Sequence, residues 1–574
     1  MNRLLLLTVF GCVGMTSDFP VLAQTGPTVP PRSLEPQRPI PPLPVTPPVQ
    51  QFPSPLVPPS SPPTRPPSPS GDRLRVERIE VVGSTVFSQA ELAAVVRPYE
   101  QRELTFEELL EIRSAVTRLY TDRGYTTSGA ILLPQAIADG VVRIQAVEGD
   151  LEQIEVRGLN NLRPGYVRDR LTLAARRPLN IPQLEAALQL LQLDPLFSSV
   201  KAELIAGSAP GRSALIVTLK EAAPVNYLAQ IDNRNSPSVG SFGGVLGLGS
   251  LNLSGLGDRF NLELSKTAGV NQLALGYDVP LTPRDARLNL NLELSSTRII
   301  EEPFESLNIG SRGFAASLGL RQPLLRTPTT EIGVGASLDL RYSKTLLDDL
   351  PFSFSLGPEA GESQVAVLRL TQDWVDRTPT RVFAARSQFS KGMDALGATV
   401  NNTGVDGRFF SWLGQFQWVQ ALNQSPNSPI LITRFATQLT GDALLPLEQI
   451  SVGGIDTVRG YRQNQRVGDS GILGSVELRL PLVRDLQGIG TIQLIPFFDV
   501  GSVWVNRAAI ETPSFNRQIS SPQTLASLGL GVRWQRGSQF SARLDWGIPL
   551  IKVNQEKNSL QDSGVTFAVQ YRFF

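Results

Sequence analysis

The C-terminal part of this chain alternates between apolar and polar residues with a period of two. The alternation is clear over residues 287–294, 331–342 and 542–548. Because successive side chains of a β-strand point to opposite faces, each segment predicts a strand with one apolar and one polar face. A soluble β-sandwich would alternate in the same way. Beyond residue 23 no segment offers the run of about 18 apolar residues that a membrane helix needs, so any membrane crossing requires a closed β-barrel.

Residues 1–23 have the pattern of a cleaved secretory signal. Arg3 precedes an apolar run, and Ala23 closes a small-residue cleavage pattern. The alternatives are a membrane anchor, for which the run is shorter than the ~20 residues that span a bilayer, and a lipoprotein signal at Cys12. The signal, the alternation over about 350 residues and the aromatic chain end together predict a transmembrane β-barrel over 225–574, with about 14 to 18 antiparallel strands.

The composition excludes several kinds of chemistry. The 574 residues include no histidine and one cysteine, Cys12, which excludes Ser-His-Asp and Cys-His mechanisms and the usual zinc sites. A formal net charge of +1 without a basic run gives no indication of a nucleic-acid partner. Paired acids such as Glu301 and Glu302 lie in a predicted loop without a supporting site. We therefore expect no enzymatic activity, no cofactor and no metal.

Residues 24–71 are rich in proline, for example PPLPVTPP over 41–48. Proline removes a backbone donor and clashes inside a helix, so no helix is expected here. The segment predicts a disordered linker that acts as an extended spacer. A ligand for a proline-binding domain is the alternative.

Two small α+β domains are predicted between the linker and the barrel, over 74–149 and 150–222. Both have a strand, two helices and two strands in that order, which indicates two copies of one unit. In the first copy we expect strands over 75–82, 124–133 and 141–147 and helices over 89–96 and 105–123. In the second copy we expect strands near 154–156, 200–205 and 213–219 and helices after Pro164 and over 182–193.

Three motifs of the first copy carry a resemblance to a known family. They are RGYTT at 123–127, LPQ at 133–135, and DGVV at 139–142 followed by VEG at 147–149. In order and spacing they resemble the first POTRA domain of two-partner secretion transporters of the hemolysin/hemagglutinin secretion-activation type. The alternative is a generic α+β domain. The resemblance implies two periplasmic POTRA domains before a barrel of 16 antiparallel strands.

Within the barrel half, SVGGIDTVRGY at 451–461 precedes a predicted strand. Its core of Val458, Arg459, Gly460 and Tyr461 resembles the tip of the long loop that folds back into the lumen in this superfamily. An ordinary surface loop is the alternative reading.

A second barrel motif, FFDVG at 497–501, alternates so that Phe497, Asp499 and Gly501 share the face opposite Phe498 and Val500. Asp499 is therefore expected to face the lumen. The resemblance pairs this aspartate with Arg459 of the loop.

The chain ends on an alternating strand that contains Tyr571, Phe573 and Phe574. Such an ending resembles the C-terminal signal that the outer-membrane assembly machinery recognises. A lipid-facing strand with an interfacial aromatic girdle is the plainer reading, and both can hold.

The resemblance implies an outer-membrane transporter that exports a partner protein by two-partner secretion. The POTRA domains, in the periplasm of a diderm bacterium, would capture the unfolded β-helical exoprotein, which would pass through the barrel without ATP. Outer-membrane lipid and the assembly machinery are the other expected partners, with no nucleic acid, and the protein is expected to be a monomer. The alternative is an assembly and insertion factor of the same superfamily, although such factors usually carry more POTRA copies. A passive porin fits the tandem domains poorly.

The proline segment departs from the family pattern. Family members often carry an N-terminal helix that occupies the pore, and the prolines of 24–71 forbid such a helix.

Overall fold

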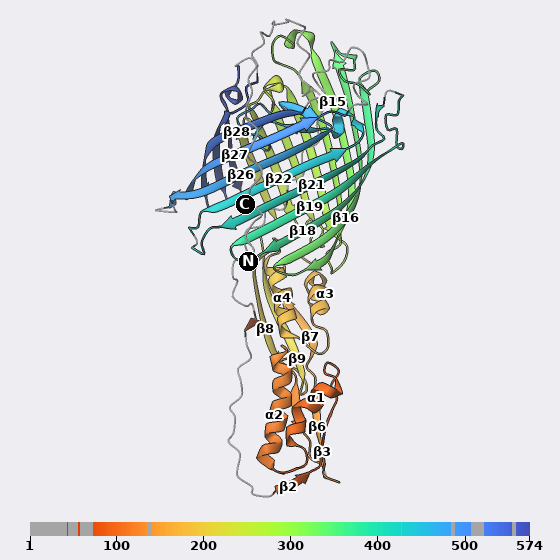
Figure 1. Ribbon diagram of the computed structural model, residues 1–574, viewed down its shortest axis with the longest axis vertical. Helices are drawn as coiled ribbons and strands as arrows, with labels where there is room; N and C mark the ends of the chain where they lie inside the picture. The colour runs from red at the N-terminus through yellow and green to blue at the C-terminus, as the bar shows by residue number, and fades with distance from the viewer. Residues whose placement is uncertain are drawn as a thin grey trace, which may run out of the picture. The chain divides into compact units, whose positions relative to one another are not determined.

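The computed structural model is shown in Figure 1. It describes residues 43, 56–57, 73–135, 137, 139–402, 404–425, 427–483, 488–506, 522–553 and 558–573. The predicted signal over 1–23 and most of the proline-rich segment lie outside the described residues. None of the helices in the described part of the chain is long and apolar enough to cross a membrane.

The first α+β unit follows the proline-rich segment. Its elements are β2 (Arg73–Val76), β3 (Arg78–Val82), α1 (Gln89–Val96), the 3-10 helix η2 (Arg97–Tyr99), β4 (Arg102–Thr105), α2 (Phe106–Asp122), β5 (Gly129–Leu132) and β6 (Val141–Val147). They form a three-stranded sheet in the order β3-β6-β5 and a two-stranded sheet, β2-β4.

Local signals explain the helices of this unit. The side chains of Ser88 and Thr105 each accept a hydrogen bond from the backbone N–H of a glutamate three residues later. The carboxylate of that glutamate accepts a hydrogen bond from the backbone N–H of the serine or threonine, so both helices begin with a capping box. On α2, Leu109, Ile112 and Val116 are buried at helical spacing. The prediction of one continuous strand over 75–82 was wrong, because the segment forms two strands, β2 and β3, with a break between them. Strand β4 was not predicted, because four residues are too few to show an alternation.

The second α+β unit repeats the order of the first. Its elements are β7 (Asp150–Arg157), α3 (Pro164–Ala174), α4 (Ile181–Gln192), β8 (Phe197–Ala206) and β9 (Arg212–Glu221). The helices pack leucine side chains, among them Leu171, Leu184 and Leu188, against the sheet.

The proline-rich segment contributes one short strand, β1 (Leu56–Val57), to this second sheet, whose order is β1-β8-β9-β7. The backbone of β1 runs parallel to Ala202 and Glu203 of β8. The prediction of a linker without structure was therefore wrong at these two residues. They are a pair of non-proline residues between prolines, so their backbone can join a sheet edge.

A closed antiparallel barrel follows, as predicted. It has sixteen strands in the described residues, and a seventeenth piece, β17 (Leu350–Pro351), only extends the outer end of β16. The sixteen are β10 (Val225–Asp232), β11 (Gly243–Leu251), β12 (Arg259–Thr267), β13 (Val270–Pro280), β14 (Arg287–Arg298), β15 (Ile309–Arg326), β16 (Thr330–Leu347), β18 (Glu362–Arg377), β19 (Arg381–Met393), β21 (Phe410–Ala421), β22 (Ile430–Thr440), β26 (Ser470–Val483), β27 (Thr491–Trp504), β28 (Gln523–Arg536), β29 (Phe540–Pro549) and β30 (Val565–Phe573). Strands β10 and β30 pair and close the ring.

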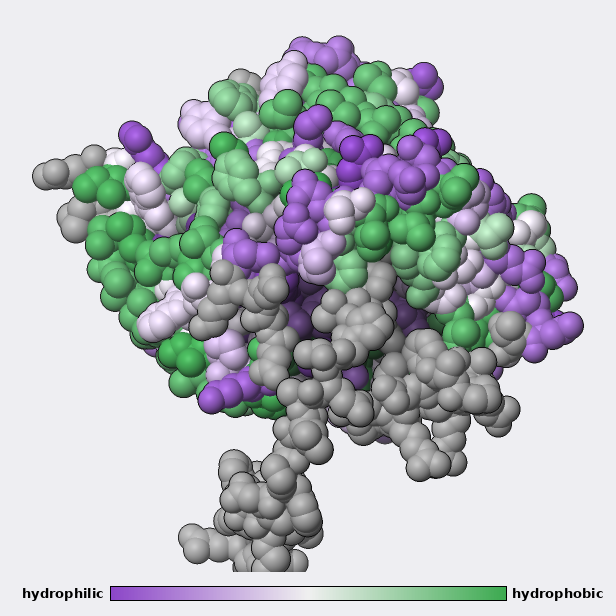
Figure 2. Space-filling model, turned by 90° about the horizontal axis from the view of Figure 1, so that it is seen from above, coloured by the Kyte–Doolittle hydropathy of each residue, from purple (hydrophilic) through white to green (hydrophobic). Residues whose placement is uncertain are grey.

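The outer face of the barrel is apolar. On β29, Leu544, Trp546 and Ile548 are about half exposed, whereas Asp545 between them is buried towards the lumen. On β14, Leu290 and Leu294 face outwards in the same way. Figure 2, a view from above, shows hydrophobic side chains gathered on the left flank of the barrel and a mixture of hydrophobic and hydrophilic ones over the face turned to the viewer. This alternation is that of a barrel whose outer surface meets lipid.

Strand β10 follows directly after the second α+β unit in the chain. The start of β10 therefore marks the end of the barrel that faces the periplasm. The turns that join β15 to β16 and β18 to β19 lie at the same end as the start of β10, the periplasmic end. The longer connections, such as β16 to β18 and β22 to β26, lie at the outer end. Short 3-10 helices occur in several of the outer connections, among them η3 (Pro237–Val239), η4 (Glu305–Leu307) and η9 (Leu560–Ser563).

The connection between β22 and β26, residues 441–469, is here called the inward loop. It contains β23 (Ala443–Leu444), the 3-10 helix η5 (Pro446–Glu448), β24 (Ile450–Val452) and β25 (Arg466–Gly468). β23 pairs with β20 (Val405–Asp406), and β24 pairs with β25. The loop buries its own apolar side chains against the barrel, since Leu447 packs near Val365 and Val452 near Val503. It therefore lies inside the lumen.

Candidate functional site

The tip of the inward loop makes a tight turn that only glycine permits. Gly460 has a φ of +89°, and a Cβ there would lie 2.8 Å from the backbone of Gly547 on β29. Gly564, directly before β30, approaches the same backbone. The three glycines thus let the loop tip and the wall meet backbone to backbone.

Arg459, beside this turn, is held by Asp499 of β27. Its Nε donates to Asp499 Oδ2 at 2.7 Å, its Nη2 donates to Oδ1 at 2.8 Å, and its backbone N–H donates to Oδ2 at 3.1 Å. Arg459 is 3% exposed and Asp499 is 0% exposed. Such a bidentate contact uses the planar fork of the guanidinium, and burial removes competing water.

The other two residues of the wall motif also serve the loop. The guanidinium carbon of Arg459 lies 3.5 Å from the ring centroid of Phe497, a cation–π contact. A Cβ at Gly501 would lie 3.0 Å from a methyl of Val458, so glycine leaves room for that fully buried side chain. The spacing of Phe497, Asp499 and Gly501 therefore corresponds to three separate contacts with one loop.

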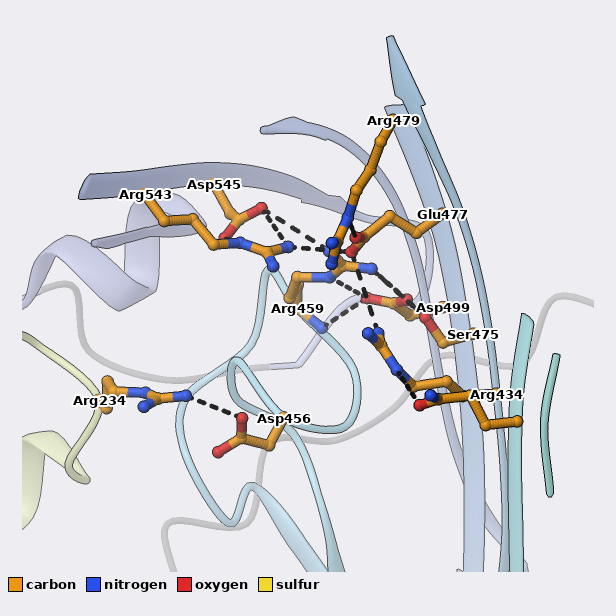
Figure 3. A network of polar contacts seen from close by, with 11 residues as sticks. Arg234, Arg434, Asp456, Arg459, Ser475, Glu477, Arg479, Asp499, Arg543 and Asp545 are labelled. Atoms are coloured by element: carbon orange, nitrogen blue, oxygen red, sulfur yellow. Dashed lines mark hydrogen bonds and ion pairs between the residues drawn. The ribbon is translucent and has the colours of Figure 1, made fainter. Parts of the chain in front are cut away.

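A wider charge network surrounds the pair (Figure 3). Arg459 Nη1 donates to Glu477 Oε2 at 3.0 Å and lies 3.6 Å from Asp545 Oδ1. Glu477 in turn accepts from Arg543 at 3.0 Å and from Arg479 at 2.7 Å. Both Glu477 and Asp545 are 0% exposed, so these carboxylates depend on the surrounding guanidinium groups for their charge compensation.

The residue after the tip motif ties the loop to the outer connections. Arg462 Nη1 donates to Glu301 at 2.8 Å, and Nη2 donates to Asp562 at 2.9 Å. The hydroxyl of Tyr461 donates to the carbonyl oxygen of Ala526 at 2.8 Å and accepts from the N–H of Ile551 at 3.1 Å. The loop is thus bonded to the wall and to the outer connections by the residues that follow Gly460, in addition to Arg459.

The predicted site residues fall in two places. The first group joins the loop tip, Val458 to Tyr461, to the wall residues Phe497, Asp499 and Gly501. The second group lies on the outer face of β30, where Tyr571 is 39% exposed and Phe573 is 50% exposed. The rings of Tyr571 and Phe573 are 4.6 Å apart. Phe574 lies outside the described residues.

Sequence reasoning treated Arg459 and Asp499 as an isolated pair and missed Glu477, Arg543 and Asp545. A signal for them was present, because the alternation that places Asp499 in the lumen applies equally to these charged positions on β26 and β29. Nothing in this arrangement resembles a nucleophile with a general base. Its chemistry is that of an ionic clamp on a loop.

A closed barrel of sixteen strands, an inward loop clamped by arginine and aspartate, and preceding α+β units together define a transporter of the outer membrane. Residues 211–534, more than half of the chain, match the family described as haemolysin secretion/activation protein ShlB/FhaC/HecB, and the chain belongs to this family. Residues 74–149 match the POTRA domain of ShlB type. The chain is accordingly a two-partner secretion transporter that exports a partner protein across the outer membrane, with POTRA domains in the periplasm.

Curated relatives agree with this assignment. The chain is 27% identical over 481 residues to the outer membrane transporter CdiB of Escherichia coli O6:K15:H31 (strain 536 / UPEC), covering 77% of this chain and 76% of that protein. It is 20% identical over 481 residues to the heme/hemopexin transporter protein HuxB of Haemophilus influenzae (strain 86-028NP), covering 80% of each. The solved structure of CdiB from Escherichia coli superposes with a TM-score of 0.68 at 22% identity, covering 89% of this chain and 92% of that one.

Proposed function

We propose that the inward loop, in the position described above, closes the export channel. The contacts of Arg459 with Asp499 and Glu477 hold the loop in this position. The observation that carries this proposal is the burial of three carboxylates around one loop guanidinium within an otherwise polar lumen. A loop tied in this way occupies the path of any exported chain. It has to leave, or shift, during transport.

Capture of the partner begins at the POTRA domains. The β3-β6-β5 sheet of the first domain ends on strand β5, where Ile131 is 40% exposed, and Leu133 just beyond β5 is 50% exposed. An unfolded segment of the exoprotein can pair its backbone with this edge and place apolar side chains on these two residues. The sheet of the second domain offers β7 as its uncovered edge, because β1 already pairs with β8.

No ATP is required for this route. The partner folds into its β-helix outside the cell, and folding there removes exported chain from the equilibrium and draws more chain outward. The protein acts as a monomer, because β10 pairs with β30 of the same chain and the barrel closes without a second copy. Outer-membrane lipid contacts the apolar outer face, and the assembly machinery reads the end of β30. We infer no enzymatic role for any of these steps.

The proposal that the partner pairs with the β5 edge is tested by placing a charge on either edge of the β3-β6-β5 sheet. Ile131→Lys on β5 should reduce secretion of the partner at least several-fold, because a lysine disfavours pairing at a sheet edge. Val82→Lys on β3 is the matched control, since Val82 is 39% exposed on the opposite edge. Secretion is measured as partner in the medium relative to transporter in the outer membrane. Loss of secretion from Val82→Lys with normal export from Ile131→Lys would assign capture to the other edge.

A further inference from the structure

A cavity of about 700 Å³ opens along the lumenal wall formed by β12 to β16, β18 and β19. The described residues that line it include four carboxylates and four guanidinium groups, together with asparagine, serine, alanine and glycine, and none is aromatic. Such a wall has balanced charge, and its apolar part comes from small and aliphatic side chains only. It suits the passage of an extended polar chain, since transport requires contacts weak enough to release.

A second part of the inward loop, remote from its tip, is bound to this wall. Glu448 of η5 is 1% exposed and accepts from Nη2 of Arg369 on β18, at 2.8 Å to Oε1 and 3.0 Å to Oε2. Arg341 of β16 lies 3.9 Å from the same carboxylate and donates to the carbonyl oxygen of Leu447. This contact is separated from the tip clamp on β26, β27 and β29 by the intervening strands β19, β21 and β22.

The direction of the strands places this contact at the outer end of the cavity. β16 runs outwards from its periplasmic turn, and Arg341 is the outermost of its residues that line the cavity. β18 runs back towards the periplasm, and Arg369 is the outermost of its lining residues. Glu448 therefore bonds to the two arginines where the cavity would open towards the cell surface.

We propose that Glu448 is a second anchor of the inward loop, and that its contact with Arg369 and Arg341 closes the outer end of the polar cavity until the exported chain displaces it. This rests on the proposed function of the inward loop. The contact can break and form again, because Arg369 has other hydrogen-bond partners. It also donates to Asp339 and, at 2.8 Å, to Ser390 Oγ. When Glu448 leaves, the arginine keeps a carboxylate partner, so opening does not strand a buried charge.

The anchor is tested with the purified full-length transporter in planar lipid bilayers. Glu448→Gln keeps the size of the side chain and removes its charge. The channel should then be open for about ten times the fraction of time seen in the wild type, which corresponds to about 1.4 kcal/mol. Glu263→Gln is the matched control, because Glu263 lines the same cavity from β12. Equal open fractions for Glu448→Gln, Glu263→Gln and the wild type would overturn the proposal.

A second variant keeps the test decisive if charge removal disturbs folding. Apart from Cys12 the chain has no cysteine, so E448C together with R369C can be joined by a bis-maleimide that contains a reducible bond. The linked protein should lose secretion, and reduction should restore it, while heat-dependent migration on gels reports an intact barrel. Normal secretion by the linked protein would contradict the proposal. Asp499→Asn, measured in parallel, reports on the tip clamp alone, so wild-type export by that variant would overturn the proposed function and leave the Glu448 result standing.

Discussion

Replacing Arg459 by alanine should release the tip of the inward loop more strongly than Asp499→Asn does. Arg459→Ala removes two side-chain bonds to Asp499 and one to Glu477. It leaves the fully buried Asp499 without a cationic partner, with only the backbone N–H of residue 459 at 3.1 Å and the hydroxyl of Ser475 at 2.7 Å. Stranding a buried charge in this way costs about 3–5 kcal/mol. The population of the seated loop should therefore fall about 100- to 5,000-fold relative to the released loop.

Asp499→Asn should cost less, about 1.5–3 kcal/mol, because Arg459 keeps Glu477 at 3.0 Å and Asp545 at 3.6 Å. Both variants should impair export of the partner while the barrel still inserts, because a tip that is no longer held at the wall lies free in the lumen, across the path of the exported chain. Since both break one contact, Arg459→Ala with Asp499→Ala should be little worse than Arg459→Ala alone.

The control for this series is Arg234→Ala. Arg234 pairs with Asp456 of the same loop at 2.9 Å, but the two side chains are 38% and 70% exposed, so the change should cost about 0–1 kcal/mol. The assay is partner secreted into the medium, normalised to folded transporter in outer-membrane fractions. Strictly additive losses in the double variant, or wild-type export from Arg459→Ala, would refute the reasoning.

Three further outcomes are expected. Deletion of Leu74–Ala223 should abolish secretion while the barrel still inserts, and export at normal levels would show that the POTRA domains do not select the partner. Removal of Thr25–Pro69 should leave assembly intact, as judged by barrel in the outer membrane, although it also removes β1 from the edge of the second sheet. Burial raises the pKa of the Glu148 carboxyl, but hydrogen bonds from Thr85 and Tyr120 outweigh this and hold that pKa below its ordinary value. The stabilisation that this depressed pKa gives is present above about pH 4.5 and is lost as the pH falls through the folded-state pKa, so urea unfolding of the POTRA domains should show a loss in acid that Glu148→Gln lacks.

Periodicity predicted the barrel well, because a wall between lipid and lumen imposes an alternation on every strand. The alternation also placed Asp499 in the lumen, but only the family resemblance paired it with Arg459. The contact of Glu448 with Arg369 could not be predicted, since the residues are 79 positions apart and meet only after the loop has folded into the closed barrel. The short strands β1 and β4 were missed because pairing with a neighbour, rather than their own pattern, makes them strands.

The meeting of Gly460 with Gly547 and Gly564 has a mechanical consequence. At this one point the loop and the wall touch through bare backbone, so the contact of Gly460 with Gly547 can open without a change of rotamer. The departure of the tip is then governed by the side chains beside Gly460, namely the polar bonds of Arg459 and Tyr461 and the buried packing of Val458. After the tip has gone, Gly547 leaves a gap in the row of lumenal side chains on β29, next to the charged pair of Arg543 and Asp545.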